Sequence, residues 1–289
     1  MKHVKAVIVL TLLLLICGVA SAEIDRSNGL PVEEKFMMTK SASASSICEI
    51  GSENCLALWD ISHGVYLNYE PAKDFSQFVA LLAGEGYPVA VTDKGILDPS
   101  VDLSSFDILI VSTLTTDDSP YSAAEVAAIK SFVDNGGKLL ILAENTDCPN
   151  ENINPVSQAF GVTTGVSYLS PLDLYITDLA SHPAFNGVST VYLRAGGELS
   201  STGTIAWTPV KYPAIDAVEG SRVIVIGDTN IFDNSYISNA DNMLFAKNLW
   251  SEVFCPPVGS PEFPTAFVPV TFVIGFIGAV LFIRRAGKL

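Results

Sequence analysis

Five polar side chains follow apolar runs that are typical of buried strands, and these are the residues best placed for chemistry. Asp60 and His63 follow the run 56–61, Glu144 follows 138–143, and Asp228 and Asn230 follow 222–227. Ligands of open parallel sheets bind at the carboxyl ends of the strands, so we expect these residues to line a pocket. Carboxylates around one imidazole could bind a hard cation or act in acid–base catalysis.

The same residue types also have a purely structural use. Asp and Asn commonly cap helices and close turns at strand ends, where Asp93, Thr113 and Asn145 also fall. His63 could equally hydrogen-bond the loop that precedes the first helix. The segment 228–234 alternates oxygen-bearing side chains but lacks the glycine and terminal glutamate of a calcium loop, so no metal is predicted there.

The elements that would position these residues are predicted from apolar spacing. A helix is expected over 74–83, and another begins at Ser122, whose spacing to Glu125 is that of a capping box. The runs 106–112, 138–143 and 222–227 are continuously apolar, as in strands buried on both faces. Further strands are predicted at 87–92, 188–194 and 212–218. A closing helix over 240–253 should bury Leu244, Phe245, Leu249 and Val253.

Helices between buried strands predict right-handed crossovers and a parallel sheet. The predicted fold class is therefore α/β, with a doubly wound, mostly parallel sheet of flavodoxin-like type. One domain is expected over 48–254, preceded by a flexible, serine-rich leader over 23–47.

Composition indicates where the protein is located. The chain of 289 residues is 49% hydrophobic, and two uncharged apolar blocks lie at 6–20 and 266–283. Five of the 16 basic residues lie in the terminal segments, whereas all 31 acidic residues lie between them, so the middle carries a charge of −20. Nucleic-acid binding through the phosphate backbone is excluded, because no basic surface is available for it.

The N-terminal segment 1–22 is typical of a secretory signal peptide. Lys2 and Lys5 precede the apolar run, and small residues precede a cleavage site expected between Ala22 and Glu23. An uncleaved anchor is the alternative, which the shortness of the run disfavours.

The C-terminal segment predicts a membrane span. A proline-rich linker over 255–265 leads to eighteen apolar residues, 266–283, and a basic tail over 284–289. Eighteen helical residues extend about 27 Å, close to the thickness of a bilayer core. The positive tail is expected inside, which leaves the acidic domain outside.

This end resembles a known sorting signal. Pro261, Glu262 and Phe263, followed by one span and by Arg284 and Arg285, resemble the PEF-CTERM signal of archaeal surface proteins. The resemblance implies processing by an archaeosortase-type enzyme, which would remove the span. A simple single-pass anchor is the alternative.

Cysteine usage agrees with an oxidising compartment. Cys48, Cys55, Cys148 and Cys255 lie outside the signal and allow three disulfide connectivities. A local loop between Cys48 and Cys55 is plausible. Zinc binding is disfavoured because no C-x₂-C unit occurs.

Four segments together resemble the DUF4350 group of the class I glutamine amidotransferase-like fold. They are WDISHG, VDNGGKLLILAEN, SHPAFNGV and GDTNIFDN…NADNMLFAKNLW, within 55–252. The resemblance implies a Cys/His/Glu active site, from which this chain departs. No nucleophile elbow follows residue 143, and Ala184 follows His182-Pro183 where that fold places a glutamate.

The sequence therefore predicts an exported cell-surface protein with a non-catalytic or degenerate amidotransferase-like domain and no cofactor. Expected partners are the membrane before processing, the sorting enzyme and envelope components, without nucleic acid. Two alternatives stay open. One is an envelope glycan or peptide hydrolase that uses the carboxylates of Asp60, Glu144 and Asp228, and the other is a ligand-binding component of a transport or sensing system.

Overall fold

A computed structural model describes residues 55–65, 69–112 and 120–256. The chain divides into two compact units, Met1–Cys48 and Glu49–Leu289, and all described residues belong to the second. The predicted signal peptide, leader, linker motif, span and basic tail lie outside the described residues, as do Thr113 and Cys48. Within the described ranges, no helix is long and apolar enough to cross a membrane.

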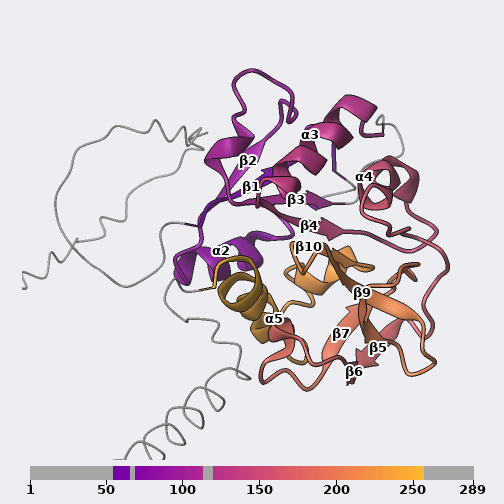
Figure 1. The fold of residues 1–289 in the computed structure, drawn as a ribbon. Helices are drawn as coiled ribbons and strands as arrows, with labels where there is room; N and C mark the ends of the chain where they lie inside the picture. Colours follow the sequence, from indigo (N-terminus) through magenta and orange to yellow (C-terminus); the bar gives the residue numbers. More distant parts are fainter. Residues whose placement is uncertain (1–54, 66–68, 113–119, 257–289) are drawn as a thin grey trace, which may run out of the picture. The chain divides into compact units, whose positions relative to one another are not determined.

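An eight-stranded sheet forms the centre of the described unit (Figure 1). Its strand order is β2-β1-β3-β4-β10-β9-β8-β6. The strands are β1 (Ala57–Asp60), β2 (Val89–Thr92), β3 (Ile108–Ser112), β4 (Lys138–Leu142), β6 (Asp178–Leu179), β8 (Thr204–Trp207), β9 (Pro213–Val218) and β10 (Val223–Ile226).

The two halves of the sheet have different pairing. Strands β2, β1, β3, β4 and β10 pair in parallel, with Ala57 opposite Ile108 and Val223 opposite Leu139. Strands β10, β9, β8 and β6 pair antiparallel. The mixed α/β class with a mostly parallel sheet is confirmed, and the antiparallel half is an addition that the sequence did not predict.

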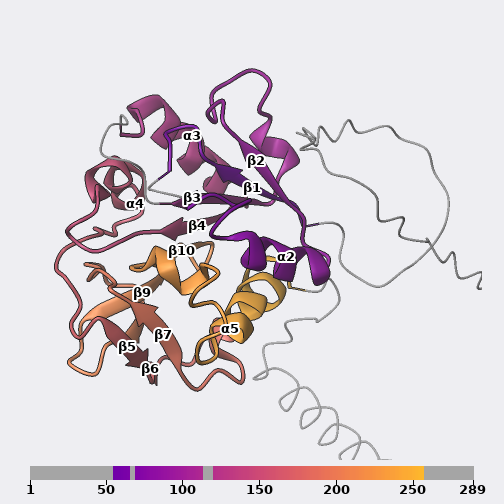
Figure 2. The ribbon, with the colours of Figure 1, turned by 180° about the vertical axis from the view of Figure 1, so that it is seen from behind.

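Helices cover both faces of the sheet, as expected for a doubly wound arrangement (Figures 1 and 2). Helices α2 (Ser76–Gly84) and α5 (Asn242–Asn248) pack on one face around Trp59, Phe78 and Trp250. Helices α3 (Ala123–Asp134) and α4 (Asn154–Gln158) pack on the other, against Leu109 and Ile141. Side chains alternate between the two cores along each strand, so the continuously apolar runs are explained by burial on both faces.

A small two-stranded sheet lies beside the first core. It pairs β5 (Asp173–Ile176) antiparallel with β7 (Val191–Arg194), and Leu174, Ile176 and Leu193 contribute to that core. Short one-turn helices complete the fold: η1 (Leu103–Ser105), η2 (Asn150–Asn152), η3 (Pro183–Phe185) and η4 (Thr229–Phe232).

The helix predictions are confirmed at α2 and α3, and in part at α5. Ser122 accepts from the backbone N–H of Glu125 while the Glu125 carboxylate accepts from the N–H of Ser122, as in the predicted capping box. The closing helix continues beyond α5 as the π-helical turn η5 (Leu249–Phe254). Leu244 was expected inside but is exposed, because Phe245 and Leu249 occupy the inward positions.

The cysteine pairing differs from the local loop suggested by the sequence. Cys55 forms a disulfide with Cys255, 200 residues away, rather than with Cys48. This bond joins the residue just before β1 to the residue just after η5, so it closes the two ends of the folded domain on each other. Cys148 is half-buried and carries a free thiol.

Candidate functional site

Glu144 lies just beyond the end of β4 and is 2% exposed. Its Oε2 accepts from the backbone N–H and the side-chain amide of Asn145, at 3.2 and 3.1 Å. Its Oε1 is buried without a hydrogen-bond partner in the described structure. Burial, assisted by the nearby Asp228 carboxylate, raises the pKa of Glu144 well above its usual range, so this side chain is a neutral acid at pH 7.

Asp228 follows β10 and is fully buried. Its Oδ1 accepts from the N–H of Asn230, and its Oδ2 from the N–H of Arg194 at 2.5 Å. These bonds favour the charged form, but burial outweighs them and raises the pKa of Asp228 to about 8. Glu144 and Asp228 therefore form a protonated or proton-sharing pair at neutral pH.

A backbone segment, Arg194–Glu198, crosses the ends of β4 and β10 at very short range. The N–H of Gly197 donates to the carbonyl of Gly227 at 2.6 Å. A Cβ at Gly197 would lie 2.3 Å from the carbonyl oxygen of Glu144, and one at Gly227 would lie 2.1 Å from that of Gly197. Only glycine permits this approach at either position. We call Arg194–Glu198 the crossing segment.

Polar side chains at the strand ends bind the crossing segment. Asp228 accepts from the N–H of Arg194, and the Asn230 amide donates to the Arg194 carbonyl at 3.0 Å. The Asn145 amide donates to the carbonyl of Ala195 at 2.7 Å. The predicted residues Glu144, Asp228 and Asn230 are thus brought together, and their neighbours are mainly backbone groups.

Two residues that the sequence analysis did not select belong to the same cluster. Tyr69, from the loop after β1, donates its hydroxyl to Oδ1 of Asn230 at 2.6 Å. Asp233 accepts from the N–H groups of Ser235 and Tyr236, and burial raises its pKa to about 6. No spacing pattern could have identified Tyr69, because its partner is 161 positions away.

Cys148 lies near Glu144 but has the wrong surroundings for a nucleophile. Burial, followed by the charges of Glu144 and Asp147, raises the pKa of its thiol to about 12. Catalytic cysteines need the opposite effect, a cation or helix end that stabilises the thiolate. Among described contacts, His182 bonds Ala184 and Ser221 instead, and acts as the cap of η3.

Asp60 and His63 form a second group rather than joining Glu144. Asp60 accepts from the N–H of Ser62 and from the hydroxyl of Tyr121. His63 contacts the Glu125 carboxylate through Nε2 at 2.8 Å, and its ring packs 4.2 Å from that of Tyr121. The group connects the loop after β1 to the N-terminus of α3. The prediction of one pocket lined by all five residues is therefore wrong in this respect, because strand β3 separates β1 from β4.

The chemical capacity of the strand ends is limited by burial. Asp93 is exposed in its loop after β2, the strand at the outer edge of the sheet. Among the described residues, no group of three His, Cys, Asp or Glu side chains is arranged to hold a metal ion. The Glu144–Asp228 pair can exchange a proton, but with exposures of 2% and 0% it cannot reach a polymeric substrate.

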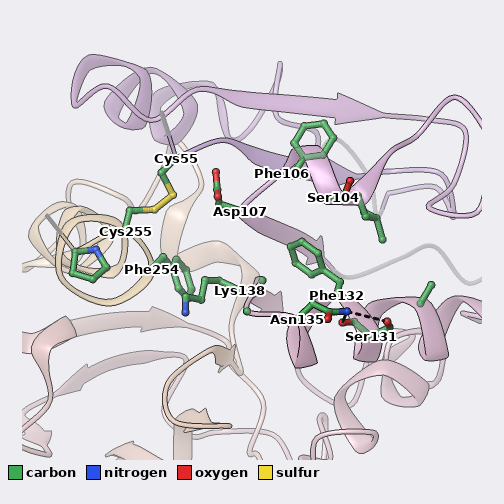
Figure 3. Close-up of a pocket in the computed structure, with 15 residues that line it drawn as sticks. Cys55, Ser104, Phe106, Asp107, Ser131, Phe132, Asn135, Lys138, Phe254 and Cys255 are labelled. Carbon is green, nitrogen blue, oxygen red and sulfur yellow. Dashed lines mark hydrogen bonds between the residues drawn. A yellow bond between two sulfur atoms is a disulfide. The ribbon is translucent and has the colours of Figure 1, made fainter. Parts of the chain in front are cut away.

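A cavity of about 750 Å³ lies at the opposite edge, where the strands begin (Figure 3). It borders the disulfide and the first residues of β3 and β4. Its size is that of a small-ligand site. The sequence analysis did not predict it, because its walls come from four separate segments: 103–107, 128–138, Cys55 and 254–256.

Sequence comparison identifies a family that spans most of the described unit. Residues 73–250, more than half of the chain, match the family described as Domain of unknown function (DUF4350). No curated protein matches the chain.

Solved structures match at low identity. The mmIFT52 N-terminal domain is 14% identical with a TM-score of 0.54, covering 67% of this chain and 95% of that one. This likeness shows a shared fold. A ThuA-like protein of Bacteroides uniformis is 15% identical, covers 72% of this chain and 94% of its own, and has a TM-score of 0.44. A GMP synthase protein of Thermoplasma acidophilum is 10% identical, covers 68% and 94%, and has a TM-score of 0.45.

The close approach of the crossing segment predicts a strong effect of Gly227→Ala. The new methyl group would overlap the Gly197 carbonyl, so we expect the free energy of unfolding to fall by about 1–3 kcal/mol or more, as for overpacked cores. Urea denaturation measures this. Gly84→Ala is the matched control, because its Cβ would meet nothing within 4 Å and should leave stability nearly unchanged. Equal midpoints for the two variants would refute the proposed constraint.

The raised pKa values predict that stability falls as pH rises. Glu144 and Asp228 are protonated more readily in the folded than in the unfolded chain, where carboxyl pKa values are about 4. Their contribution is therefore complete below about pH 4 and is lost as pH approaches 8. Urea midpoints measured at pH 5 and pH 8 should show this decrease.

Glu144→Gln should reduce that decrease, because an amide stays neutral at both pH values. Asp98→Asn is the control: Asp98 is exposed and its pKa is lowered by Ser100, so its contribution changes only in acid. If Glu144→Gln shows the same loss between pH 5 and pH 8 as the unmodified protein, the carboxyl pair is not responsible.

Proposed function

Because this chain belongs to the DUF4350 family, we propose that it is an exported cell-surface protein whose domain is a non-catalytic binding or structural module. One observation carries the proposal. At the edge where this type of fold usually presents reactive groups, Asp228, Asn145 and Asn230 are hydrogen-bonded to the backbone of the crossing segment. Side chains that hold the fold together in this way are not free to act on a substrate.

The thiol at this edge supports the same conclusion. Cys148 is the one cysteine with a free thiol in the described part of the chain, and carboxylates rather than an imidazole surround it. An amidotransferase-type mechanism needs a thiolate, a base and backbone donors for the oxyanion. The environment of Cys148 opposes the first of these requirements.

The second candidate, an envelope glycan or peptide hydrolase, draws on Glu144. Its Oε1 has no partner among the described residues, and its raised pKa beside Asp228 is the kind of difference that acid–base pairs need. Both carboxyl groups are buried, however, and Asp60 belongs to a different group. We therefore favour the module.

Retention at the surface is proposed on the sequence features of the two ends. The signal over 1–22 would direct export. The motif Pro261-Glu262-Phe263, with the span 266–283 and the basic tail, would direct processing by an archaeosortase-type enzyme. Envelope components would then be the partners of a domain whose acidic surface faces the exterior.

The non-catalytic assignment predicts an unreactive thiol. At pH 8 the Cys148 thiolate fraction is small, so alkylation by iodoacetamide should be at least about a hundredfold slower than for an exposed cysteine. Mass spectrometry of the peptide that contains Cys148 gives the rate, and the urea-unfolded protein serves as the control. Alkylation at the unfolded rate in the native protein would favour a reactive site.

The sorting assignment predicts the mass of the surface form. The mature protein should begin at Glu23 and lack the span 266–283, with an added group in its place. Intact-mass measurement of protein isolated from the cell surface tests both ends. A mature chain that retains 264–289 would refute processing and leave an ordinary single-pass anchor.

A further inference from the structure

The cavity at the amino edge of the sheet has largely aromatic walls. Phe106, Phe132 and Phe254 border it together with the Cys55–Cys255 disulfide (Figure 3). The Phe132 ring lies against the backbone of Gly137, where a Cβ would be 2.5 Å from the ring. Such a surface suits apolar or proline-rich groups, because aromatic-lined grooves bind extended proline-rich segments.

One cation borders the same cavity. Lys138, the first residue of β4, is half-buried and has no ion-pair partner among the described residues. Burial lowers its pKa, with a contribution from Arg222, so an anion nearby would be stabilising. Asp107, also at the cavity, already accepts from the N–H of Leu56. The cavity therefore combines aromatic surface with an unpaired positive charge.

The chain itself leaves the domain from this cavity. Cys255 and Pro256 are lining residues, and the disulfide fixes the point of departure. The residues that follow, 257–264, read Pro-Val-Gly-Ser-Pro-Glu-Phe-Pro. Seven residues separate Pro256 from Phe263, a reach of up to about 24 Å, which exceeds the dimensions of the cavity. A tethered segment this short has an effective concentration in the millimolar range.

We propose that the linker 257–264 docks into this cavity of its own chain, with Phe263 between the aromatic side chains and Glu262 paired with Lys138. The occupant matches the site in three respects: it is proline-rich, it carries one aromatic side chain, and its acid lies beside that side chain. A second copy of the protein could offer the same segment, but only the tethered one is held at the cavity.

Docking would place Pro261, Glu262 and Phe263 against the folded domain. This consequence rests on the proposed function: the motif would be covered while it is docked, so a processing enzyme could act only on the undocked fraction. The docking itself does not depend on which enzyme processes the chain, or on whether any does.

The test uses the full chain in detergent micelles. A zero-length carbodiimide reagent joins amines to carboxylates in direct contact, and peptide mass spectrometry identifies the product. We expect a Lys138–Glu262 cross-link that is absent in Lys138→Gln and unchanged in Lys130→Gln, whose lysine pairs with Asp134 on the surface of α3. Phe263→Ala should reduce the yield about tenfold or more, because a buried phenylalanine contributes at least that factor to binding.

An equal mixture of isotopically heavy and light chains distinguishes the occupants. Cross-links within single-label chains support docking of the chain's own linker, whereas mixed-label products would show that a second copy supplies the segment and would overturn the proposal. Hydrogen exchange gives an independent measurement: amides of 131–138 should exchange faster in Phe263→Ala. Unchanged exchange together with no Lys138–Glu262 product would also overturn it. Neither result depends on the mass of the surface form.

Discussion

The contact of backbone with backbone at Gly197 and Gly227 is the constraint on which the carboxyl edge of this sheet depends. The hydrogen bond of 2.6 Å between these residues places the crossing segment directly on the ends of β4 and β10. Once it is there, the carbonyl and N–H groups of Arg194 and Ala195 need partners away from water. Asp228, Asn230 and Asn145 supply them. Covering these side chains excludes solvent, and that exclusion raises the pKa values of Glu144 and Asp228.

The two edges of the sheet therefore differ from the usual division of labour in doubly wound folds. Ligands commonly bind at the carboxyl edge, whereas here a backbone segment covers part of it. At the amino edge, the disulfide and the beginnings of β3 and β4 surround a cavity of about 750 Å³. The open surface and the unpaired lysine are thus at the edge that the family resemblance would not select.

Much of the parallel half was predictable, because its signals are local. The continuous apolar runs of β3, β4 and β10 and the Ser122–Glu125 capping box each determine one element. The antiparallel half was predicted less well. Strand β5 has only four residues, and β6 has two, too few for alternation to be recognised. Cys55 pairs with Cys255 because the first and last elements meet in space, which no spacing rule specifies.

The same reasoning explains the partial success at the candidate site. Glu144 and Asp228 lie together because β4 and β10 are neighbours in the sheet, although more than eighty residues separate them in sequence. Asp60 ends a strand of the same direction, but β3 lies between β1 and β4. Strand-end position was therefore a sound guide to which residues lie at this edge. The grouping among them depends on strand order, which the sequence did not supply.

The Cys55–Cys255 bond also determines how the domain would respond to mechanical load. A tension applied between the chain before Cys55 and the chain after Cys255 passes through two sulfur atoms and bypasses the sheet. The 200 residues between them form a closed side branch that carries none of that force. Fluid shear or attachment at both ends could then stretch the tails fully without separating β4 from β10. Unfolding by pulling would first require that the disulfide be reduced.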